Sequence, residues 1–479
     1  MCSSLLGRPV SGRPIQRGFG SWVRAMQLPA LVLPAAMLTA LCVAMTASTA
    51  DAGIGLGNQQ TVGGVMIAPD GSVRAATIEE QKEMAQVVRN AMQVPAGELA
   101  EATDRRVISL NGLQAALQEA HESGKHLDTE TMFLAGMQRI EYVIVDEENN
   151  DILLAGPAEP WMVRPDGHVV GTKTGGSVLR LDDLVTAFSS VETARNDGGI
   201  RCSIEPTAEG RVRLQNFLKN VKLRPGQNPA YLEAGMRQAF GPQQIFLAGV
   251  PTDSRFARTL VAADFEMKRI AMGLTQSPVA GLPSYLEIAK NQAQSSVSSP
   301  RWWMACDYDP IAHDADGRVW KISGQGVKTL TEDDTFDKEG KVRSTGRQNP
   351  LATKWADMMT EQFEDLSRER PVFRDLRNAM DLAVVATLVT QQQLDQKSGI
   401  DLSVLRGKDS QVELASYDMP KTLEPQCSFI KGRAGWTVTA SGGVNVNAFA
   451  VSENAVIDET LGSVAVASDS ASRWWWNSK

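Results

Sequence analysis

The sequence predicts an α+β protein in which hairpin-built antiparallel sheets pack against amphipathic helices, in two domains after a signal peptide. Asp-Gly dipeptides occur at 70–71, 166–167 and 316–317, each between short segments of strand-like residues. Asp-Gly favours two-residue hairpins because both turn positions need positive φ. Apolar residues recur at helical spacing between these hairpins, without the regular strand–helix alternation of a parallel sheet.

The composition is that of a globular protein. The chain has 479 residues, of which 43% are hydrophobic and 22% charged, so it can bury a sizeable core. Its formal net charge of −8 disfavours sequence-independent nucleic-acid binding. We therefore expect no nucleic-acid partner.

Residues 1–52 have the pattern of a secretory signal peptide. Residues 1–27 carry four arginines and no acidic residue, 28–45 are apolar, and Ala50-Asp51-Ala52 fits a small-x-small cleavage site. A membrane anchor is the alternative, but Pro29, Pro34 and the small-residue exit argue against it. Cleavage near Ala52 would give an exported, periplasmic or secreted chain of net charge −11. No later run is apolar enough to span a bilayer.

The first expected domain covers 53–290. Thr77 and Glu80 form a capping-box pair at the start of a helix, and Asp253 is placed to cap the clearest helix, over 256–274. The other expected elements are a helix over 110–120, a strand–turn–strand over 139–157, a short helix over 181–188, a strand over 200–206, a helix over 211–221 and a buried strand over 243–251.

The polar segment 291–299 marks the expected domain boundary, and the second domain covers 300–460. A β region over 301–330 and a polar stretch over 331–349 come first. We expect two helices, over 352–370 and from Pro371 onward, then a hairpin over 435–451. A Trp-rich tail, 461–479, ends the chain.

Several core segments resemble a family of exported planctomycete proteins known only as domain of unknown function 1598. The resemblance covers most of 60–450 and implies an exported α+β protein, without an activity, cofactor or catalytic residue. The similar stretches are 63–71 (GGVMIAPDG), 141–161, 178–188, 253–274, 281–286 (GLPSYL), 301–311 (RWWMACDYDPI) and 373–389.

Metal and catalytic motifs mostly fail on spacing. His121 and His126 are i, i+5, whereas a zinc helix needs i, i+4. Asp314, Asp316 and Gly317 resemble part of a calcium loop that lacks its bidentate Glu, so a hairpin turn is expected there. Serine and lysine motifs at 428–431 and 173–175 occur in the reverse of the order that penicillin-recognising enzymes need. We expect no metal and no cofactor.

Two ionic pairs lie at i, i+4 spacing on apolar helices, Asp264 with Lys268 and Arg377 with Asp381. A salt bridge is one interpretation. The other is that Asp264 or Asp381 points into a polar cleft as an acid–base group. Arg258 and Arg377 are the basic candidates for binding.

Tryptophans are the second kind of candidate. Neighbouring strand residues face opposite sides, so one of Trp302 and Trp303 is expected in the core and the other exposed for stacking on a sugar or at an interface. The Trp474–Trp476 run is open between a loose tail, a packing strand and a binding element.

Three cysteines remain after cleavage: Cys202, Cys306 and Cys427. Either one disulfide and one free thiol or three buried thiols fit them.

The leading hypothesis is a non-enzymatic exported protein that binds an envelope protein or glycan, or is a structural component of the envelope. The alternative is an envelope glycan or peptide hydrolase with paired carboxylates. Its candidates are Asp253, Asp264, Asp307, Asp309 and Asp381.

Overall fold

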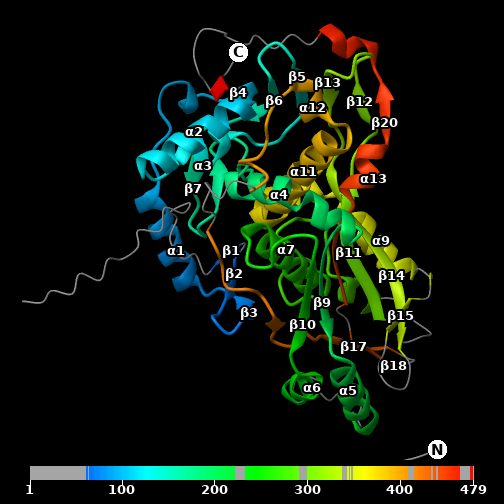
Figure 1. Ribbon diagram of the computed structural model, residues 1–479. Helices are drawn as coiled ribbons and strands as arrows, with labels where there is room; N and C mark the ends of the chain where they lie inside the picture. Colours follow the sequence, from blue (N-terminus) through cyan, green and yellow to red (C-terminus); the bar gives the residue numbers. More distant parts are fainter. Residues whose placement is uncertain are drawn as a thin grey trace, which may run out of the picture. The chain divides into compact units, whose positions relative to one another are not determined.

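The computed structural model describes eleven stretches of the chain (Figure 1). The expected signal peptide, nearly all of the expected boundary and Trp474 lie outside these stretches. The described residues are 61–62, 64–221, 232–290, 299–336, 342–344, 346, 349–407, 415–432, 435–438, 441–463 and 475–477.

A ten-stranded mixed sheet draws strands from both sides of residues 291–299. Most neighbours are antiparallel, while β3 with β16 and β11 with β19 are parallel. Its spatial order is β1 (Thr61–Val62), β2 (Val65–Ile67), β3 (Ser72–Ala75), β16 (Thr422–Leu423), β10 (Gln243–Ala248), β9 (Ile200–Pro206), β19 (Ser441–Val446), β11 (Ser299–Asp307), β14 (Gly326–Phe336) and β15 (Val342–Ser344).

A seven-stranded sheet also combines early and late parts of the chain. Its spatial order is β20 (Ala455–Ile457), β12 (Ile311–His313), β13 (Val319–Lys321), β5 (Tyr142–Asp146), β6 (Asp151–Ala158), β4 (Thr103–Ser109) and β21 (Trp476–Asn477). Two short ribbons are β7 (Trp161–Val163) with β8 (Val169–Gly171), and β17 (Phe429–Gly432) with β18 (Gly435–Val438).

Hairpins form at all three Asp-Gly sites and connect β2 to β3, β7 to β8 and β12 to β13. The expected two-residue turn is wrong, because each connection spans four or five residues and only its glycine, not its aspartate, has a positive φ. Gly71, Gly167 and Gly317 have φ of 83°, 87° and 62°, a region that favours glycine. Asp314 Oδ1 accepts hydrogen bonds from the backbone N–H groups of Arg318 and Val319, so this aspartate stabilises a turn, as expected.

The predicted helices form, with shifted ends. The Thr77–Glu80 capping box opens α1 (Ile78–Ala91), and α2 (Leu110–Ser123) ends at Gly124 in the left-handed region. The helix predicted as short is α4 (Leu181–Asn196). The remaining helices of this half are α3 (Thr129–Met132), α5 (Ala208–Asn220), α6 (Glu233–Phe240) and α8 (Tyr285–Lys290).

Three local predictions were wrong. The side chain of Ser254, not Asp253, caps α7 (Arg255–Ala271) by accepting from the N–H of Ala257. The single helix predicted over 352–370 is divided at Gln362 into α9 (Pro350–Glu361) and α10 (Phe363–Glu369). The hairpin predicted over 435–451 does not form, because β18 pairs with β17, β19 enters the ten-stranded sheet, and α13 (Ala448–Glu453) follows.

The centre of the core is α11 (Pro371–Gln391), which begins at the predicted proline. Every residue from Pro371 to Val389 is buried, as expected for a helix enclosed on all sides. It packs against α4, α7, α13 and β14 (Figure 1) and is followed by α12 (Leu394–Ser398). Among the described residues, no helix is both long and apolar enough to cross a membrane.

Candidate functional site

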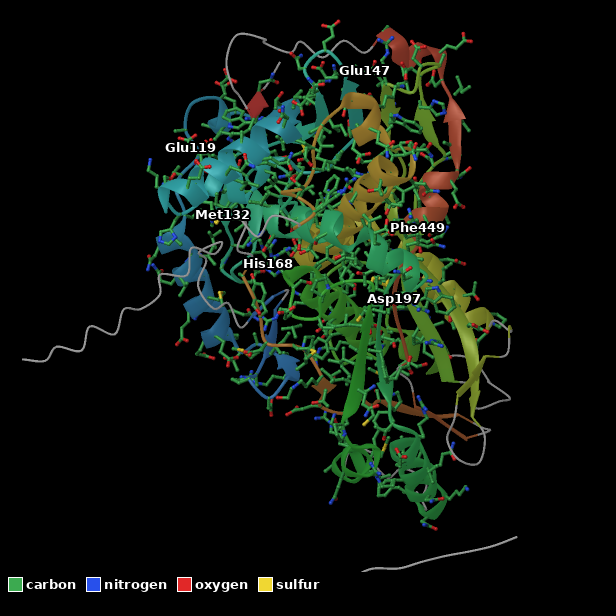
Figure 2. All side chains as sticks on the ribbon, in the orientation of Figure 1. Glu119, Met132, Glu147, His168, Asp197 and Phe449 are labelled. Carbon is green, nitrogen blue, oxygen red and sulfur yellow. The ribbon has the colours of Figure 1, made fainter. Side chains whose placement is uncertain are left out.

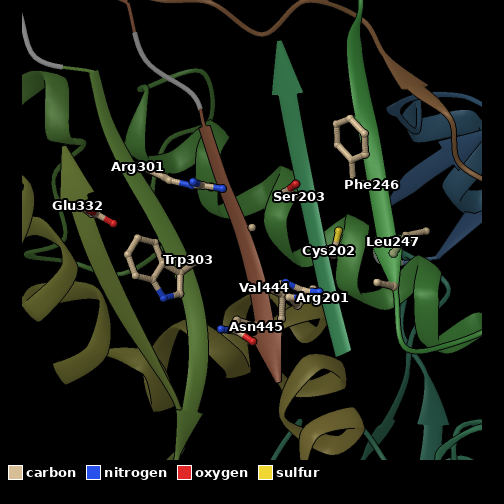
Figure 3. Close-up of a pocket in the computed structure, with 13 residues that line it drawn as sticks. Arg201, Cys202, Ser203, Phe246, Leu247, Arg301, Trp303, Glu332, Val444 and Asn445 are labelled. Atoms are coloured by element: carbon tan, nitrogen blue, oxygen red, sulfur yellow. The ribbon is translucent and has the colours of Figure 1, made fainter. Parts of the chain in front are cut away.

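One face of the ten-stranded sheet carries a shallow pocket of about 540 Å³ that crosses five adjacent strands (Figure 3). These strands are β10, β9, β19, β11 and β14, in that order. Alternation along each strand decides which side chains reach this face. On β11, Trp302 is fully buried whereas Trp303 lines the pocket.

A single cross-strand row runs through the pocket. Phe246 pairs with Ser203, Ser203 with Gly443, and Gly443 with Trp303. Phe246 is 54% exposed and forms one aromatic wall of the pocket, and Trp303 forms the other. Three strand spacings separate the backbones of the two aromatic residues, about 14 Å. Figure 3 shows Trp303 and Phe246 on opposite sides of Ser203.

The bottom of this pocket is formed by two glycines, Gly442 and Gly443, whose backbones pack closely against the neighbouring strands. Gly442 has a φ of 122°, and a Cβ there would meet the Trp302 carbonyl oxygen at 1.6 Å. A Cβ on Gly443 would meet the Cys202 carbonyl oxygen at 1.8 Å. Neither position accepts a side chain without a backbone shift, so the space between the two aromatic walls stays open.

Polar side chains border the aromatic row on both sides. At one end Arg301 forms an ion pair with Glu205 at 3.2 Å, and Glu332 lies opposite Arg301 on β14. At the other end Asn445 pairs in register with Arg201. In the described part of the chain, no hydrogen bond engages the indole N–H of Trp303 or the side-chain amide of Asn445. The pocket therefore combines two aromatic faces with donors and acceptors that a ligand can use.

The opposite face of this sheet is part of the core. Helix α7 packs on β9, β19 and β11, and α9 packs on β14. Trp302 contacts Tyr285 and Trp355 edge-to-face at ring centroid distances of 5.0 Å each, and its N–H donates to the Ala352 carbonyl. The candidate Trp302 is thus a core residue, and Trp303 is the tryptophan with access to a ligand.

The structure buries Asp264 completely at the α7–sheet interface. Lys268 Nζ donates to Asp264 Oδ2 at 2.9 Å and to the carbonyl oxygens of Ile204 and Gly442, so the expected i, i+4 pair forms. Burial raises the pKa of Asp264 to about 7, and its Oδ1 has no hydrogen-bond partner among the residues that the structure describes. Through Lys268, Asp264 is connected to β9 and β19, and it lines neither the pocket on the sheet nor a second pocket beside α7 and α8.

Arg377 and Asp381 do not pair with each other. Asp381 is fully buried, accepts from Arg139 Nε at 3.1 Å and accepts from the Tyr308 hydroxyl at 2.7 Å. Arg377 is bonded to Glu364 instead. The two groups therefore belong to separate contacts of α11, and neither faces the pocket on the sheet.

The last basic candidate, Arg258, is also buried. Its guanidinium lies 4.6 Å from the centroid of the Tyr417 ring and donates to the Asp418 carbonyl. It joins α7 to the segment around residue 417. Arg258 is therefore a packing residue, not an open binding group.

An ion cluster was not predicted, which we define as the buried Asp183, Arg255 and Asp375 with the half-buried His168 and Asp166. Arg255 is bonded to Asp183 and lies 3.2 Å from Asp375, while His168 lies 3.2 Å from Asp166. Burial raises the pKa of Asp183. His168 is half-buried, whereas Glu119 and Glu147 are exposed and lie at the periphery of the view in Figure 2. The cluster connects α4, α7, α11 and the β7–β8 ribbon.

The expected carboxylates line neither the pocket on the sheet nor the second pocket beside α7 and α8. That second pocket, of about 980 Å³, lies along the α7–α8 loop and has Glu287 as its one charged lining residue. None of Asp253, Asp264, Asp307, Asp309 and Asp381 lines this pocket or the one on the sheet. No group of three or more His, Cys, Asp or Glu among the described residues could hold a metal ion.

The three described cysteines are free thiols, so the expected disulfide does not form among them. Cys202 and Cys427 are buried, as the other expectation has it, whereas Cys306 is half-buried. Burial raises the pKa of Cys306 to about 12, that of Cys427 to about 11, and that of Cys202 well above its ordinary value. Because the thiolate is the nucleophile, these cysteines are poorly suited to covalent catalysis.

The sequence indicates Trp303 but not Phe246 as a residue of the pocket, because 243–251 has the apolar pattern of a buried strand. Only Gln243 of β10 is buried; Gln244 and Phe246 are exposed. The alternation of Gln244, Phe246 and Ala248 was the available signal, but it does not reveal which face is covered.

The fold and the pocket define an α+β protein with a ligand-accessible sheet face. Residues 202–285 match the family model described as Protein of unknown function (DUF1598). The match confirms the resemblance over these residues, which include most of β9, all of β10 and α7, and Ser203 and Phe246 of the cross-strand row. No curated protein matches the chain, and no solved structure does.

Proposed function

We propose that the protein is an exported, non-enzymatic binding protein of the cell envelope that holds a linear glycan across the open face of the ten-stranded sheet. The observation that carries the proposal is the row in which Phe246 and Trp303 flank Ser203 and Gly443. Export rests on the signal-peptide pattern of residues 1–52.

The chemistry of the row favours a sugar chain. Pyranose rings present C–H groups on their faces, and aromatic rings carry negative charge on theirs, so the two stack. Hydroxyl groups at the edges of a sugar need both donors and acceptors. Arg301 and Asn445 offer donors beside the row, and Glu332 offers an acceptor. The distance between the aromatic walls suits a ligand longer than a disaccharide.

The contacts of the acidic groups favour binding over hydrolysis. Glu205 on β9 is engaged by Arg301, and Glu332 on β14 accepts from the N–H of Gly346 at 2.7 Å. A general acid or base needs a carboxyl group that is free to exchange a proton with its substrate. Both groups serve as acceptors at the border of the pocket.

The test is a calorimetric titration of the purified chain with soluble fragments of envelope polysaccharides. We expect binding by the wild type and a loss of about tenfold or more in Trp303→Ala and in Phe246→Ala, which corresponds to about 1.4 kcal/mol. Met162→Ala is the matched control, since Met162 is 46% exposed on β7, away from the pocket.

Three outcomes would overturn the proposal. The wild type could bind none of the glycans, or Trp303→Ala could bind as well as the wild type. Release of new reducing ends during the titration would contradict the non-enzymatic part. Saturable binding of an envelope protein that survives Phe246→Ala would indicate a partner elsewhere.

A further inference from the structure

The C-terminal residues form a strand at the edge of the seven-stranded sheet. Trp476 pairs with Ile108 and Asn477 with Val107, antiparallel to β4. The N–H of Ser109 donates to the Trp475 carbonyl at 2.9 Å. A segment remote in sequence thus completes the backbone pairing of β4.

The indole of Trp476 has two polar contacts at this edge. The Arg106 guanidinium lies 4.8 Å from the ring centroid, and the indole N–H donates to Glu130 Oε1 at 3.3 Å. A cation over an indole is the favoured aromatic–cation pair. The position that pairs with Ile108 is therefore selective for an aromatic side chain with an N–H donor.

Arg106 is a charged residue that is buried where β21 pairs with β4. It is fully buried, and within the described part of the chain its Nε and Nη1 have no hydrogen-bond partner, while Nη2 donates to the carbonyl oxygens of Glu98 and Glu101. Burial also raises the pKa of Glu130. The indole thus interacts with two ionisable side chains that are otherwise poorly partnered in the protein.

We propose that the edge of β4, with Arg106 and Glu130, is a binding site for an extended peptide carrying a tryptophan, and that the chain closes this site with its own C-terminal residues. Strand addition to a sheet edge supplies affinity through the main chain and specificity through one side-chain pocket. Residues 475–477 show the ligand chemistry directly, since they occupy the site in this chain.

Intramolecular closure sets how the site responds to other peptides. A ligand joined by a short linker has an effective concentration in the millimolar range. A free peptide of similar sequence must therefore compete with residues 475–477 and binds the intact chain weakly. When the indole of residue 476 is removed, the competition falls and the site opens to peptide in solution.

This inference is independent of the glycan proposal, because its residues lie on β4, α3 and β21 and not on the ten-stranded sheet. The test uses the full chain carrying Trp476→Ala and a fluorescent peptide of residues 471–479, with fluorescence anisotropy as the readout. We expect the variant to bind this peptide at least tenfold more tightly than the wild type. A peptide with alanine in place of Trp476 is the matched control and should not bind.

Hydrogen exchange at Ser109 gives a second readout. Its amide should be protected in the wild type, exchange faster in Trp476→Ala, and regain protection when the wild-type peptide is added. If Trp476→Ala fails to fold, Asn477→Pro displaces the strand by removing a backbone donor and keeps the indole. Equal peptide affinity of wild type and variant, or no binding by either variant, would overturn the proposal.

Discussion

The two faces of the ten-stranded sheet use the same strands for different purposes. Trp302 and Trp303 are neighbours on β11, yet Trp302 is fully buried between Tyr285 and Trp355, while Trp303 lines the open pocket. The residues on both faces are similar in kind. The two faces differ in what packs on them. Helices α7 and α9 pack on the face that carries Trp302, while the face that carries Trp303 holds the pocket.

Of the two adjacent tryptophans on β11, Trp302 therefore stabilises the core and Trp303 is available to a ligand. The covered face fixes the register of β11 between β19 and β14. That register in turn places Trp303 in line with Ser203 and Phe246. The core thus positions the site that we propose for ligand binding.

The largest expected effect separates the two tryptophans. Trp302→Ala should lower the free energy of unfolding by about 3–5 kcal/mol, because it leaves a cavity among large buried rings. Trp303→Ala should change it by less than about 1 kcal/mol, as for a surface substitution. Urea denaturation followed by circular dichroism measures both. Similar losses in the two variants would contradict the division between the faces.

The next largest effect is a pH dependence of the free energy of unfolding, caused by Asp264 on the covered side of the sheet. Burial holds the pKa of Asp264 at about 7 in the folded chain, above its unfolded value of about 3.9. The folded state therefore binds the extra proton between these values, so this contribution to stability is complete below about pH 4 and is lost as pH rises through about 7.

Asp264→Asn removes this titration and is its test. Relative to that variant, the wild type should lose up to about 4 kcal/mol of unfolding free energy between pH 4 and 8. Differences between urea titrations at matched pH values cancel the contributions of other groups. A difference that stays constant, or one that grows with pH in favour of the wild type, would show that Asp264 is ionised throughout.

A smaller effect is expected at the floor of the pocket. Gly442→Ala should cost about 1–3 kcal/mol, because alanine is strained at a φ of 122° and its Cβ meets the Trp302 carbonyl. Ser203→Ala on the neighbouring strand should be nearly neutral. Thermal unfolding of both variants, compared with the wild type, measures the difference. Two equally stable variants would mean that the floor is not held by close backbone packing.

The smallest effect is expected for the ion pair of the open face. Arg301 and Glu205 are 3.2 Å apart, with side chains 32% and 14% exposed. A double-mutant cycle with Arg301→Met and Glu205→Gln should give a coupling of about 0.2–1 kcal/mol. A coupling of several kcal/mol would indicate that this end of the pocket is structural and not poised for a ligand.

Local features of the fold were predictable from the sequence, whereas sheet order was not. The hairpin at Asp70-Gly71 and the Thr77 cap depend on a few adjacent residues, and both formed as expected. The position of β19 between β9 and β11 depends on partners far apart in the chain, so the predicted hairpin over 435–451 was wrong.

The candidate site was predictable to a similar extent. Alternation along β11 indicated that one of Trp302 and Trp303 is exposed. The i, i+4 rule found Asp264 with Lys268, but it also suggested Arg377 with Asp381, whose actual partners are on other elements. Helix spacing limits which side chains can meet, and tertiary packing decides which of them do.

The most direct test of the glycan site is to fill the space between its aromatic walls. Ser203→Trp keeps Phe246 and Trp303 and occupies the floor between them. Affinity electrophoresis in gels containing the best-bound polysaccharide compares this variant with Ser203→Ala. Our account predicts that Ser203→Trp migrates as in a sugar-free gel, while Ser203→Ala is retarded like the wild type. Equal retardation of Ser203→Trp and the wild type would contradict ligand binding across this face.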